Sequence, residues 1–242
     1  MEETIQIKGL SKSYDGRKVL ENLSFSVAAG EVYGLLGANG AGKSTAIEAI
    51  LGTRQADSGS VRILGLNPWK QRKQLFEQVG VQLQDTNYPD KIKVKELCEE
   101  TACLYKHPAN CDELLQRFGL KDKKNAFVSE LSGGQRQKLF IVLSLIPNPE
   151  VVFLDELTTG LDTKARRSVW KSLLELKEQG MTILLSSHFM DEVEILCDRI
   201  GILRDGKFVF EGTVHEAEAL SSCEKLEDAY LWFAEEEETD NE

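Results

Sequence analysis

The chain has 242 residues, of which 29 are lysine or arginine and 40 are aspartate or glutamate, so its formal net charge is −11. Hydrophobic residues make up 41% and charged residues 29%, which is ordinary for a globular domain and excludes disorder of the whole chain. The longest nearly apolar run, residues 139–146, is far shorter than the roughly 20 residues that a membrane-spanning helix needs. A pI near 5.0 argues against sequence-independent binding to nucleic acid, so no nucleic-acid partner is expected.

The first 30 residues alternate apolar and polar side chains. Apolar residues recur with a period of two over residues 5–7 and 23–27, and Asp15-Gly16 marks a turn between the two runs. This alternation predicts a small antiparallel sheet at the N-terminus. A short apolar strand at residues 31–36 then leads into a glycine-rich loop. A helix is predicted at residues 46–52 and strands at 61–64 and 79–83.

The composition changes near residue 86, where a helical pattern begins. Residues 95–118 have helical spacing that is interrupted at His107-Pro108, and a second helix is predicted from Gly134 to Ile146. The apolar residues expected to line one side of this small helical unit are Leu97, Leu104, Leu114, Leu115 and Phe118, with Thr101 among them. We therefore predict a helical subdomain at about residues 86–147, inserted within an α/β domain.

An α/β pattern resumes after this insertion. Strands are predicted at residues 151–155 and 181–187, helices at 166–179 and 191–197, and a hairpin at 199–203 and 207–212. The chain ends in a block of like charge, which repels itself and stays solvated. These observations predict one α/β domain over residues 1–220, with an acidic tail at residues 221–242.

Residues 37–44 spell the pattern G-x-x-x-x-G-K-S between a predicted strand and a predicted helix. Glycines let consecutive backbone N–H groups surround a phosphate, and the following helix directs its positive N-terminal end at the same anion. Lys43 is then expected to reach the β- and γ-phosphates, and the Ser44 hydroxyl to ligate Mg²⁺. The predicted nucleotide-binding residues of this segment are Gly37, Asn39, Gly40, Ala41, Gly42, Lys43, Ser44 and Thr45.

Two carboxylates end the apolar strand predicted at residues 151–155. Because a strand interior does not tolerate charge, Asp155 and Glu156 are expected at the carboxyl edge of the sheet, where α/β proteins bind ligands. Asp155 is a candidate Mg²⁺ ligand, and Glu156 is a candidate general base that polarises the attacking water. His188 follows another strand and is expected to contact the γ-phosphate. Glu156, His188 and Lys43 therefore form the predicted catalytic group.

A second glycine pair opens the helix predicted after residue 133. Ser132, Gly133, Gly134 and Gln135 place a hydroxyl and two glycines at a helix N-terminus, which is a second anion-binding arrangement. One phosphate chain rarely needs two such sites within one chain. We therefore expect this segment to complete a nucleotide site on another copy.

Together these residues resemble the ATP-binding subunit of an ATP-binding-cassette (ABC) transporter over roughly residues 3–215. GANGAGKST is similar to the family's Walker A loop, VVFLDE to its Walker B strand, LSGGQ to its signature and SSH to its histidine switch. The resemblance also implies a role for three further residues. Tyr14 occupies the position of the aromatic that stacks on adenine, Gln84 that of the Q-loop metal ligand, and Asp162 that of the D-loop aspartate.

The resemblance implies a fold and a mechanism. The implied fold is a P-loop NTPase core with a mostly parallel sheet, an N-terminal antiparallel β-subdomain and an inserted helical subdomain. Two such subunits, either identical or related cassettes, pair head to tail around ATP and Mg²⁺, and hydrolysis releases them. A groove near Gln84 receives a helix from a separate membrane permease. The expected location is therefore cytoplasmic, at the inner face of the cell membrane.

Some features depart from the family pattern or leave alternatives open. Ala38 and Leu157 stand where the family often has proline, which reduces local rigidity but removes no phosphate contact. Gln82 lies two residues before Gln84 with the same side chain, so the Q-loop register is ambiguous, and we choose Gln84. The spelling of residues 79–97 is similar to the drug and antibiotic export branch (ABC-2 type). The alternative function is a cytosolic ABC ATPase that acts as an ATP-gated switch without a membrane role.

Overall fold

The computed structural model describes residues 3–83, 88, 91–156 and 158–235. The strands are β1 (Glu3–Tyr14), β2 (Arg17–Ala28), β3 (Val32–Leu36), β4 (Ser58–Ile63), β5 (Val79–Gln82), β6 (Val151–Asp155), β7 (Thr182–Ser187), β8 (Arg199–Arg204) and β9 (Lys207–Gly212). The helices are α1 (Lys43–Ile50), α2 (Arg72–Leu75), α3 (Val94–Ala102), α4 (Cys111–Arg117), α5 (Gly133–Leu145), α6 (Thr163–Glu178), α7 (Met190–Leu196), α8 (Val214–Ser221) and α9 (Leu226–Glu235). Within the described ranges, none of the helices combines the length and apolar character that a bilayer span demands.

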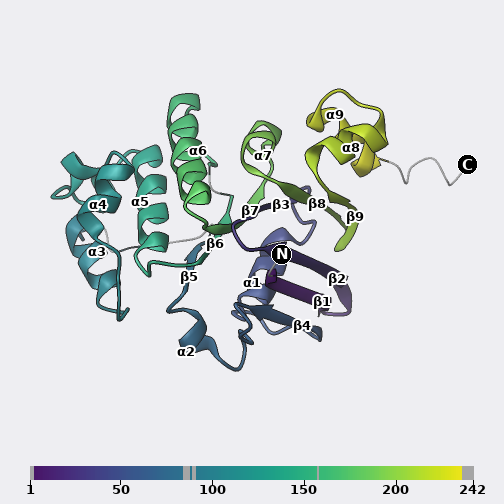
Figure 1. Ribbon diagram of the computed structural model, residues 1–242, viewed down its shortest axis with the longest axis horizontal. Helices are drawn as coiled ribbons and strands as arrows, with labels where there is room; N and C mark the ends of the chain where they lie inside the picture. Colours follow the sequence, from purple (N-terminus) through teal and green to yellow (C-terminus); the bar gives the residue numbers. More distant parts are fainter. Residues whose placement is uncertain (1–2, 84–87, 89–90, 157, 236–242) are drawn as a thin grey trace, which may run out of the picture.

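The larger sheet has the strand order β5-β6-β7-β3-β8-β9, and all its pairs are parallel except β8 with β9. Every residue of β3, β6 and β7 is buried. Continuous burial is typical of parallel strands that are covered on both faces. Figure 1 shows α1 on one side of this sheet and α5, α6 and α7 on the other. The predicted fold class, an α/β core with a mostly parallel sheet, is therefore confirmed.

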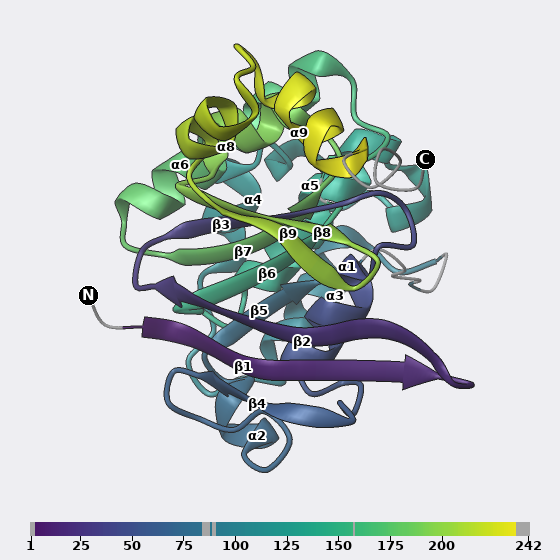
Figure 2. The same cartoon turned by 90° about the vertical axis from the view of Figure 1, so that its right-hand side faces the viewer.

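A second, antiparallel sheet is formed by β2, β1 and β4. The turn between β1 and β2 has positive φ angles at Asp15 (48°) and Gly16 (80°), as a two-residue hairpin turn requires. Apolar residues of this sheet, among them Ile5 and Phe25, share one core with Ile47 of α1 and Phe153 of β6. Figure 2 shows this small sheet as a separate layer, with α1 between the two sheets. The core thus fixes the start of α1 against both sheets.

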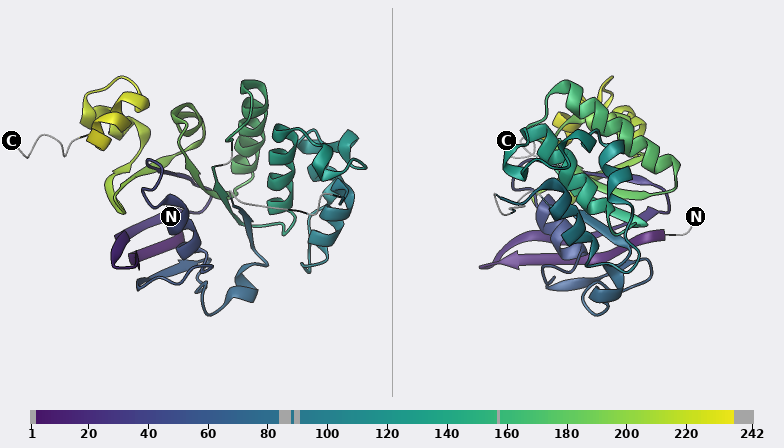
Figure 3. Two further views of the ribbon diagram at one scale, coloured as in Figure 1. Left: turned by 180° about the vertical axis from the view of Figure 1, so that it is seen from behind. Right: turned by 90° about the vertical axis from the view of Figure 1, so that its left-hand side faces the viewer.

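Helices α3, α4 and α5 lie between β5 and β6, in the segment predicted as a helical insertion. Leu97 of α3, Leu115 of α4 and Leu139 of α5 belong to one buried cluster that continues onto β6 and α6. Helix α5 approaches β5 so closely that a Cβ on Gly80 would lie 1.9 Å from the carbonyl oxygen of Ser144. Only glycine permits this contact. The right-hand view of Figure 3 shows these teal helices and green α6 in front of the sheet.

The structure corrects the prediction at two places. Leu104 is 75% exposed and not part of the helical core, because α3 ends at Ala102, before its periodicity would bury this residue. An acidic tail is predicted at residues 221–242, but Leu226–Glu235 within that range form helix α9. Leu226 and Phe233 are buried against β8 and α7 in a third apolar cluster. That burial stabilises a helix in a segment whose charge suggests solvation.

Candidate active site

Three neighbouring strands of the larger sheet end at one edge with polar groups. The glycine loop follows β3, Glu156 follows β6 and His188 follows β7, and in the sheet β7 lies between β6 and β3. They border one cavity of about 670 Å³. The cavity is lined by Tyr14, Val19, Asn39, Gly40, Gly42, Lys43, Ser44, Thr45, Glu156, Thr159 and His188. The topology therefore brings together groups that are up to 174 residues apart in the chain, from Tyr14 to His188 (188 − 14).

The glycine loop is shaped by close backbone packing. Gly42 precedes α1 with a φ of 107°, and a Cβ there would lie 2.7 Å from the carbonyl oxygen of Val19. A side chain at this position would collide with β2 as well as strain the backbone. Gly37 and Ala41 are buried and do not line the cavity. The loop therefore keeps its N–H groups near the cavity because glycine allows the chain to pass β2 closely.

Lys43, the first residue of α1, is buried at the base of the cavity with 5% exposure. Its Nζ donates hydrogen bonds to the carbonyl oxygens of Gly37 (2.7 Å) and Ala38 (3.1 Å). Burial lowers the pKa of Lys43, and the negative charges of Glu156 and Asp155 oppose this shift. The ammonium group thus sits inside the loop, in the field of two carboxylates.

Ser186 of β7 organises the two carboxylates at the end of β6. Its hydroxyl donates to Asp155, which is 3% exposed, and accepts from the backbone N–H of Glu156 at 3.0 Å. Glu156 has a φ of 49°, a conformation that non-glycine residues rarely adopt and that concentrates at functional sites. Its backbone N–H also donates to the carbonyl oxygen of Ser186. This turn separates the roles of the two acids: Asp155 stays buried, and Glu156 faces the cavity.

His188 faces Glu156 across the cavity edge. The distance from His188 Nδ1 to Glu156 Oε1 is 3.9 Å, and the side chains are 39% and 11% exposed. Sequence reasoning paired both residues with the phosphate but did not place them beside each other. Their proximity follows from the parallel pairing of Asp155 in β6 with Ser186 in β7.

Tyr14 ends β1 and forms part of the cavity wall. Lys12 Nζ and Arg54 Cζ each lie 5.3 Å from the centroid of its ring. Its hydroxyl is buried without a hydrogen-bond partner among the described residues. The aromatic predicted for this position is thus held by cation–π contacts rather than by its hydroxyl.

The predicted signature residues lie outside this cavity. Ser132 caps α5 by accepting a hydrogen bond from the backbone N–H of Gln135 (3.3 Å), and Gln135 Oε1 accepts one from the N–H of Ser132 (3.0 Å). Ser132 and Gly133 are exposed, and a Cβ on Gly133 would meet nothing within 4 Å. Gly134 belongs to the same first turn. The segment is therefore an open, preformed helix N-terminus away from the cavity of its own chain.

Two other predicted residues have different outcomes. Asp162 caps α6 by accepting a hydrogen bond from the N–H of Ala165 at 2.8 Å, so α6 starts at Thr163 rather than Arg166. Gln84 lies outside the described residues. Gln82, the alternative to it, is 4% exposed in β5 and donates to the carbonyl oxygen of Leu83. Gln82 does not line the cavity.

Sequence reasoning missed the serine and glutamate residues behind these groups. Ser186 and Ser187 are almost completely buried at the end of β7, and the carboxylate of Glu192 accepts the hydroxyl of Ser187. Two consecutive serines ending an apolar strand were a signal, because buried hydroxyls need partners. Glu192 had no local signal, because its partners lie on other elements.

A strand, a glycine loop and a helix beside an acidic strand end define a P-loop nucleoside triphosphatase. The family model described as ABC transporter matches residues 20–159 of this chain. The chain is 39% identical over 229 residues to the Nod factor export ATP-binding protein I of Rhizobium etli, an alignment that covers 92% of this chain and 72% of that protein.

Solved structures agree with this relationship. An ATP-binding subunit of an ABC transporter matches with a TM-score of 0.86 and 28% identity, covering 95% of this chain and 99% of that one. A dimeric bacterial ABC transporter cassette matches with a TM-score of 0.77 and 25% identity, covering 86% and 98%. The chain belongs to the ABC transporter family, and it is an ATP-binding subunit with ATPase activity.

Proposed function

We propose that the working unit is a pair of cassettes that bind ATP between them. Each ATP molecule lies between the cavity of one copy and residues 132–135 of the other. One observation carries the proposal: Lys43, Glu156 and His188 line one cavity, while the open helix N-terminus at Ser132 is not part of that lining. A helix N-terminus with exposed N–H groups favours an anion. The match to a dimeric cassette supports such pairing.

Within that unit, each group around the cavity has a defined task. The N–H groups of the glycine loop and Lys43 bind the β- and γ-phosphates, and Tyr14 stacks on adenine. Glu156 accepts a proton from the attacking water, and His188 contacts the γ-phosphate and the side chain of Glu156. The 3.9 Å between His188 Nδ1 and Glu156 Oε1 supports this joint placement. Residues 132–135 of the second copy contact the same γ-phosphate. Asp162 of the second copy lies at the interface between the two copies.

The oxygen groups at this edge suit a magnesium ion. Magnesium prefers a few protein oxygens together with phosphate oxygens and water, and Ser44 and Asp155 supply a hydroxyl and a carboxylate here. The negative charges of Asp155 and Glu156 both raise the pKa of Lys43, so the end of β6 offers negative charge beside the first residue of α1. Ser44 and Asp155 would therefore hold the ion, with Gln84 as the third candidate. When bound, it would neutralise charge that develops on the transferred phosphoryl group.

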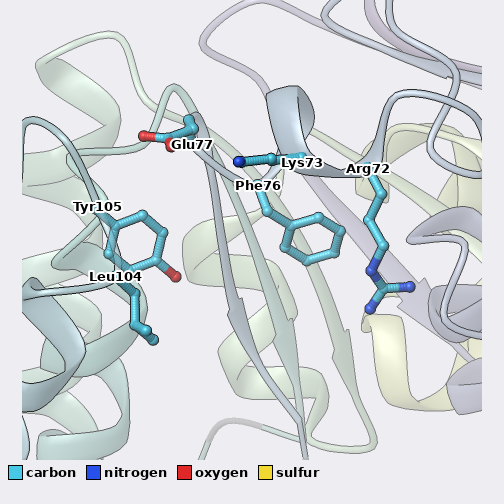
Figure 4. Close-up of a pocket in the computed structure, with 6 residues that line it drawn as sticks. All are labelled: Arg72, Lys73, Phe76, Glu77, Leu104 and Tyr105. Carbon is cyan, nitrogen blue, oxygen red and sulfur yellow. The ribbon is translucent and has the colours of Figure 1, made fainter.

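A groove beside the helical subdomain offers a docking place for a membrane partner. A cavity of about 450 Å³ is lined by Arg72, Lys73, Phe76, Glu77, Leu104 and Tyr105. Figure 4 shows Phe76 and Lys73 on one side facing Leu104 and Tyr105 on the other. We propose that a helix of a separate membrane-spanning permease binds here, because the exposed Leu104 and the ring of Phe76 offer apolar contacts between charged residues.

The direction of transport follows from the relatives. The Rhizobium etli protein is named as a Nod factor export protein, and the present chain covers most of its length. We propose that this chain powers export through its permease and works at the cytoplasmic face of the cell membrane. Closure of the pair around ATP and its opening after hydrolysis would move the helix that is docked at Leu104.

Affinity purification from detergent-solubilised membranes tests this function. Tagged protein should recover a multi-spanning membrane chain in a stoichiometric complex that withstands high salt. Recovery of ribosomes or nucleic acid in place of such a chain would instead establish the alternative, a cytosolic ATP-gated switch.

A further inference from the structure

Glu192 is a fully buried carboxylate that accepts a hydrogen bond from Ser187, the residue before His188. It lies on α7 with 0% exposure, and it does not line the cavity. Its Oε1 accepts a hydrogen bond from Trp170 Nε1 at 3.0 Å, and its Oε2 accepts one from Ser187 Oγ at 2.5 Å. A carboxylate is costly to bury, and an unmet buried donor is costly too. The side chains of Trp170 and Ser187 are therefore both held by hydrogen bonds to the carboxylate of Glu192.

Ser187 also connects Glu192 to Phe189, the residue that follows His188. Besides donating to Glu192, the Ser187 hydroxyl accepts a hydrogen bond from the backbone N–H of Phe189 at 3.0 Å. Because this N–H occupies a lone pair of the oxygen, the hydroxyl proton stays directed at the carboxylate. His188 is thus the middle residue of three, and both of its neighbours are fixed through Glu192.

Helix α6 holds the same loop at two further points. The guanidinium carbon of Arg166 lies 4.0 Å from the ring centroid of Phe189, and its Nη1 lies 3.3 Å from Asp191 Oδ2. Trp170, the donor to Glu192, is one turn further along this helix. The helix itself begins at the Asp162 cap. Helix α6 therefore contacts the residues that follow His188 through Arg166, and it is linked to Ser187, which precedes His188, through Trp170 and Glu192.

We propose that Glu192 is a positioning residue that sets the place of His188 and couples it to α6. The inference rests on the proposed role of His188. Glutamine at this position could accept from Trp170 through Oε1 and donate to the Ser187 oxygen through Nε2. The link between Trp170 and Ser187 would then persist, with the hydrogen bond to Ser187 reversed in direction. Alanine would leave both donors unmet and remove the Trp170–Glu192–Ser187 link, while the contacts of Arg166 with Phe189 and Asp191 remain.

A double-mutant cycle with His188 tests this coupling. Single-turnover cleavage of ATP, normalised to the ATP bound per chain, is compared for Glu192→Ala, His188→Ala and the double variant. We expect Glu192→Ala to slow cleavage about tenfold and to add little to His188→Ala, because residues that act through each other are non-additive. Glu192→Gln should stay within about threefold of the parental rate. Glu194→Gln, on the same helix, is the control: its amide oxygen can still accept the backbone N–H of Leu226, and the rate should be unchanged.

The outcomes separate this inference from the proposed function. Equal losses from Glu192→Ala in the parental and His188→Ala backgrounds would overturn the positioning role, as would a parental rate in Glu192→Ala. A parental rate in His188→Ala would instead remove the proposed role of the histidine. If Glu192→Ala fails to fold, Ser187→Ala carries the same cycle, since it breaks the link to Phe189 and leaves the carboxylate in place.

Discussion

Ser186 determines how the two carboxylates at the end of β6 differ. One hydroxyl satisfies the buried Asp155 and also accepts the backbone N–H of Glu156, whose positive φ turns its side chain toward the cavity. The same edge contains Lys43, whose ammonium group is partly neutralised by both acids. The chemistry of the site therefore depends on a few buried hydrogen bonds as much as on the reacting groups.

The general-base assignment predicts the behaviour of Glu156→Gln. The amide keeps the size of the side chain but cannot accept the proton of water, so turnover should fall by about 10²-fold or more. ATP binding should persist, because the phosphate cradle is untouched. Steady-state phosphate release measures the loss of turnover, and equilibrium nucleotide titration measures the retained ATP binding. Turnover at the parental rate would mean that another group accepts the proton of water.

Stacking on Tyr14 predicts a small and selective loss of affinity. Tyr14→Ala should weaken ATP binding by about 1 kcal/mol, or roughly fivefold, because only the ring contact is removed. Tyr14→Phe is the matched control and should bind like the parent, since the Tyr14 hydroxyl has no hydrogen-bond partner among the described residues. Calorimetric titration of ATP and of triphosphate alone distinguishes base stacking from phosphate binding. Equal losses for both ligands would argue against stacking.

Burial raises the pKa of Glu192, while the hydrogen bonds from Ser187 and Trp170 act in the opposite direction. A carboxyl whose pKa is higher in the folded than in the unfolded chain contributes stability below the unfolded pKa. That contribution is lost as the pH rises through the folded value. Glutamine does not titrate, so Glu192→Gln should gain stability relative to the parent as the pH rises from about 4.5 toward neutrality.

Urea unfolding at several pH values measures this difference. Glu100→Gln, at an exposed glutamate on α3, should show no such trend. A difference between Glu192→Gln and the parent that stays constant with pH, or that moves in the other direction, would contradict the assigned cause.

Sequence spacing singled out residues that the structure brings to one cavity, among them Lys43 and Glu156, but not the buried residues that contact them. Lys43 and Glu156 stand in short local patterns, so the backbone rules for phosphate loops and strand ends apply to them directly. Glu192 and Trp170 are 22 residues apart and meet only because α6 and α7 pack together. A single sequence contains no local signal for such a pair.

At the scale of elements, periodicity was a good guide wherever a helix or strand runs its full length. The strands at residues 151–155 and 182–187 and the helix from Gly133 agree with their apolar patterns. Leu104 was misjudged because α3 ends at Ala102, which leaves this residue on the surface. Helix α9 was missed because its apolar residues become buried only against β8 and α7.

The proposed docking groove predicts that a substitution at the exposed Leu104 weakens binding of the membrane partner. Leu104→Glu should reduce recovery of the membrane chain several-fold in the detergent experiment, because a charge replaces an apolar contact in the groove. The ATPase rate of the isolated cassette should stay unchanged, since this residue is 75% exposed and does not line the cavity. Leu220→Glu, at a 65% exposed leucine on α8, is the matched control. Equal recovery with both variants would place the partner elsewhere.

For the whole molecule, the proposed pairing of two copies rests on the separation of the cavity from residues 132–135 within one copy. The apolar core between the sheets fixes the phosphate loop, and the helical cluster around Leu139 fixes the N-terminus of α5. These are two different apolar clusters, and residues 132–135 are not part of the cavity lining that includes Lys43. Two copies that face each other head to tail would supply both halves to each ATP.

A mixed-copy crosslink tests this central claim most directly. In the Glu156→Gln background, which should hold ATP without cleaving it, one copy carries Ala38→Cys at the exposed part of the phosphate loop and the other carries Ser132→Cys. The background without either substitution controls for the native cysteines. The account predicts an oxidised dimer only when both copies are mixed and ATP is present. An ATP-dependent dimer on size-exclusion chromatography that never forms this crosslink would contradict it.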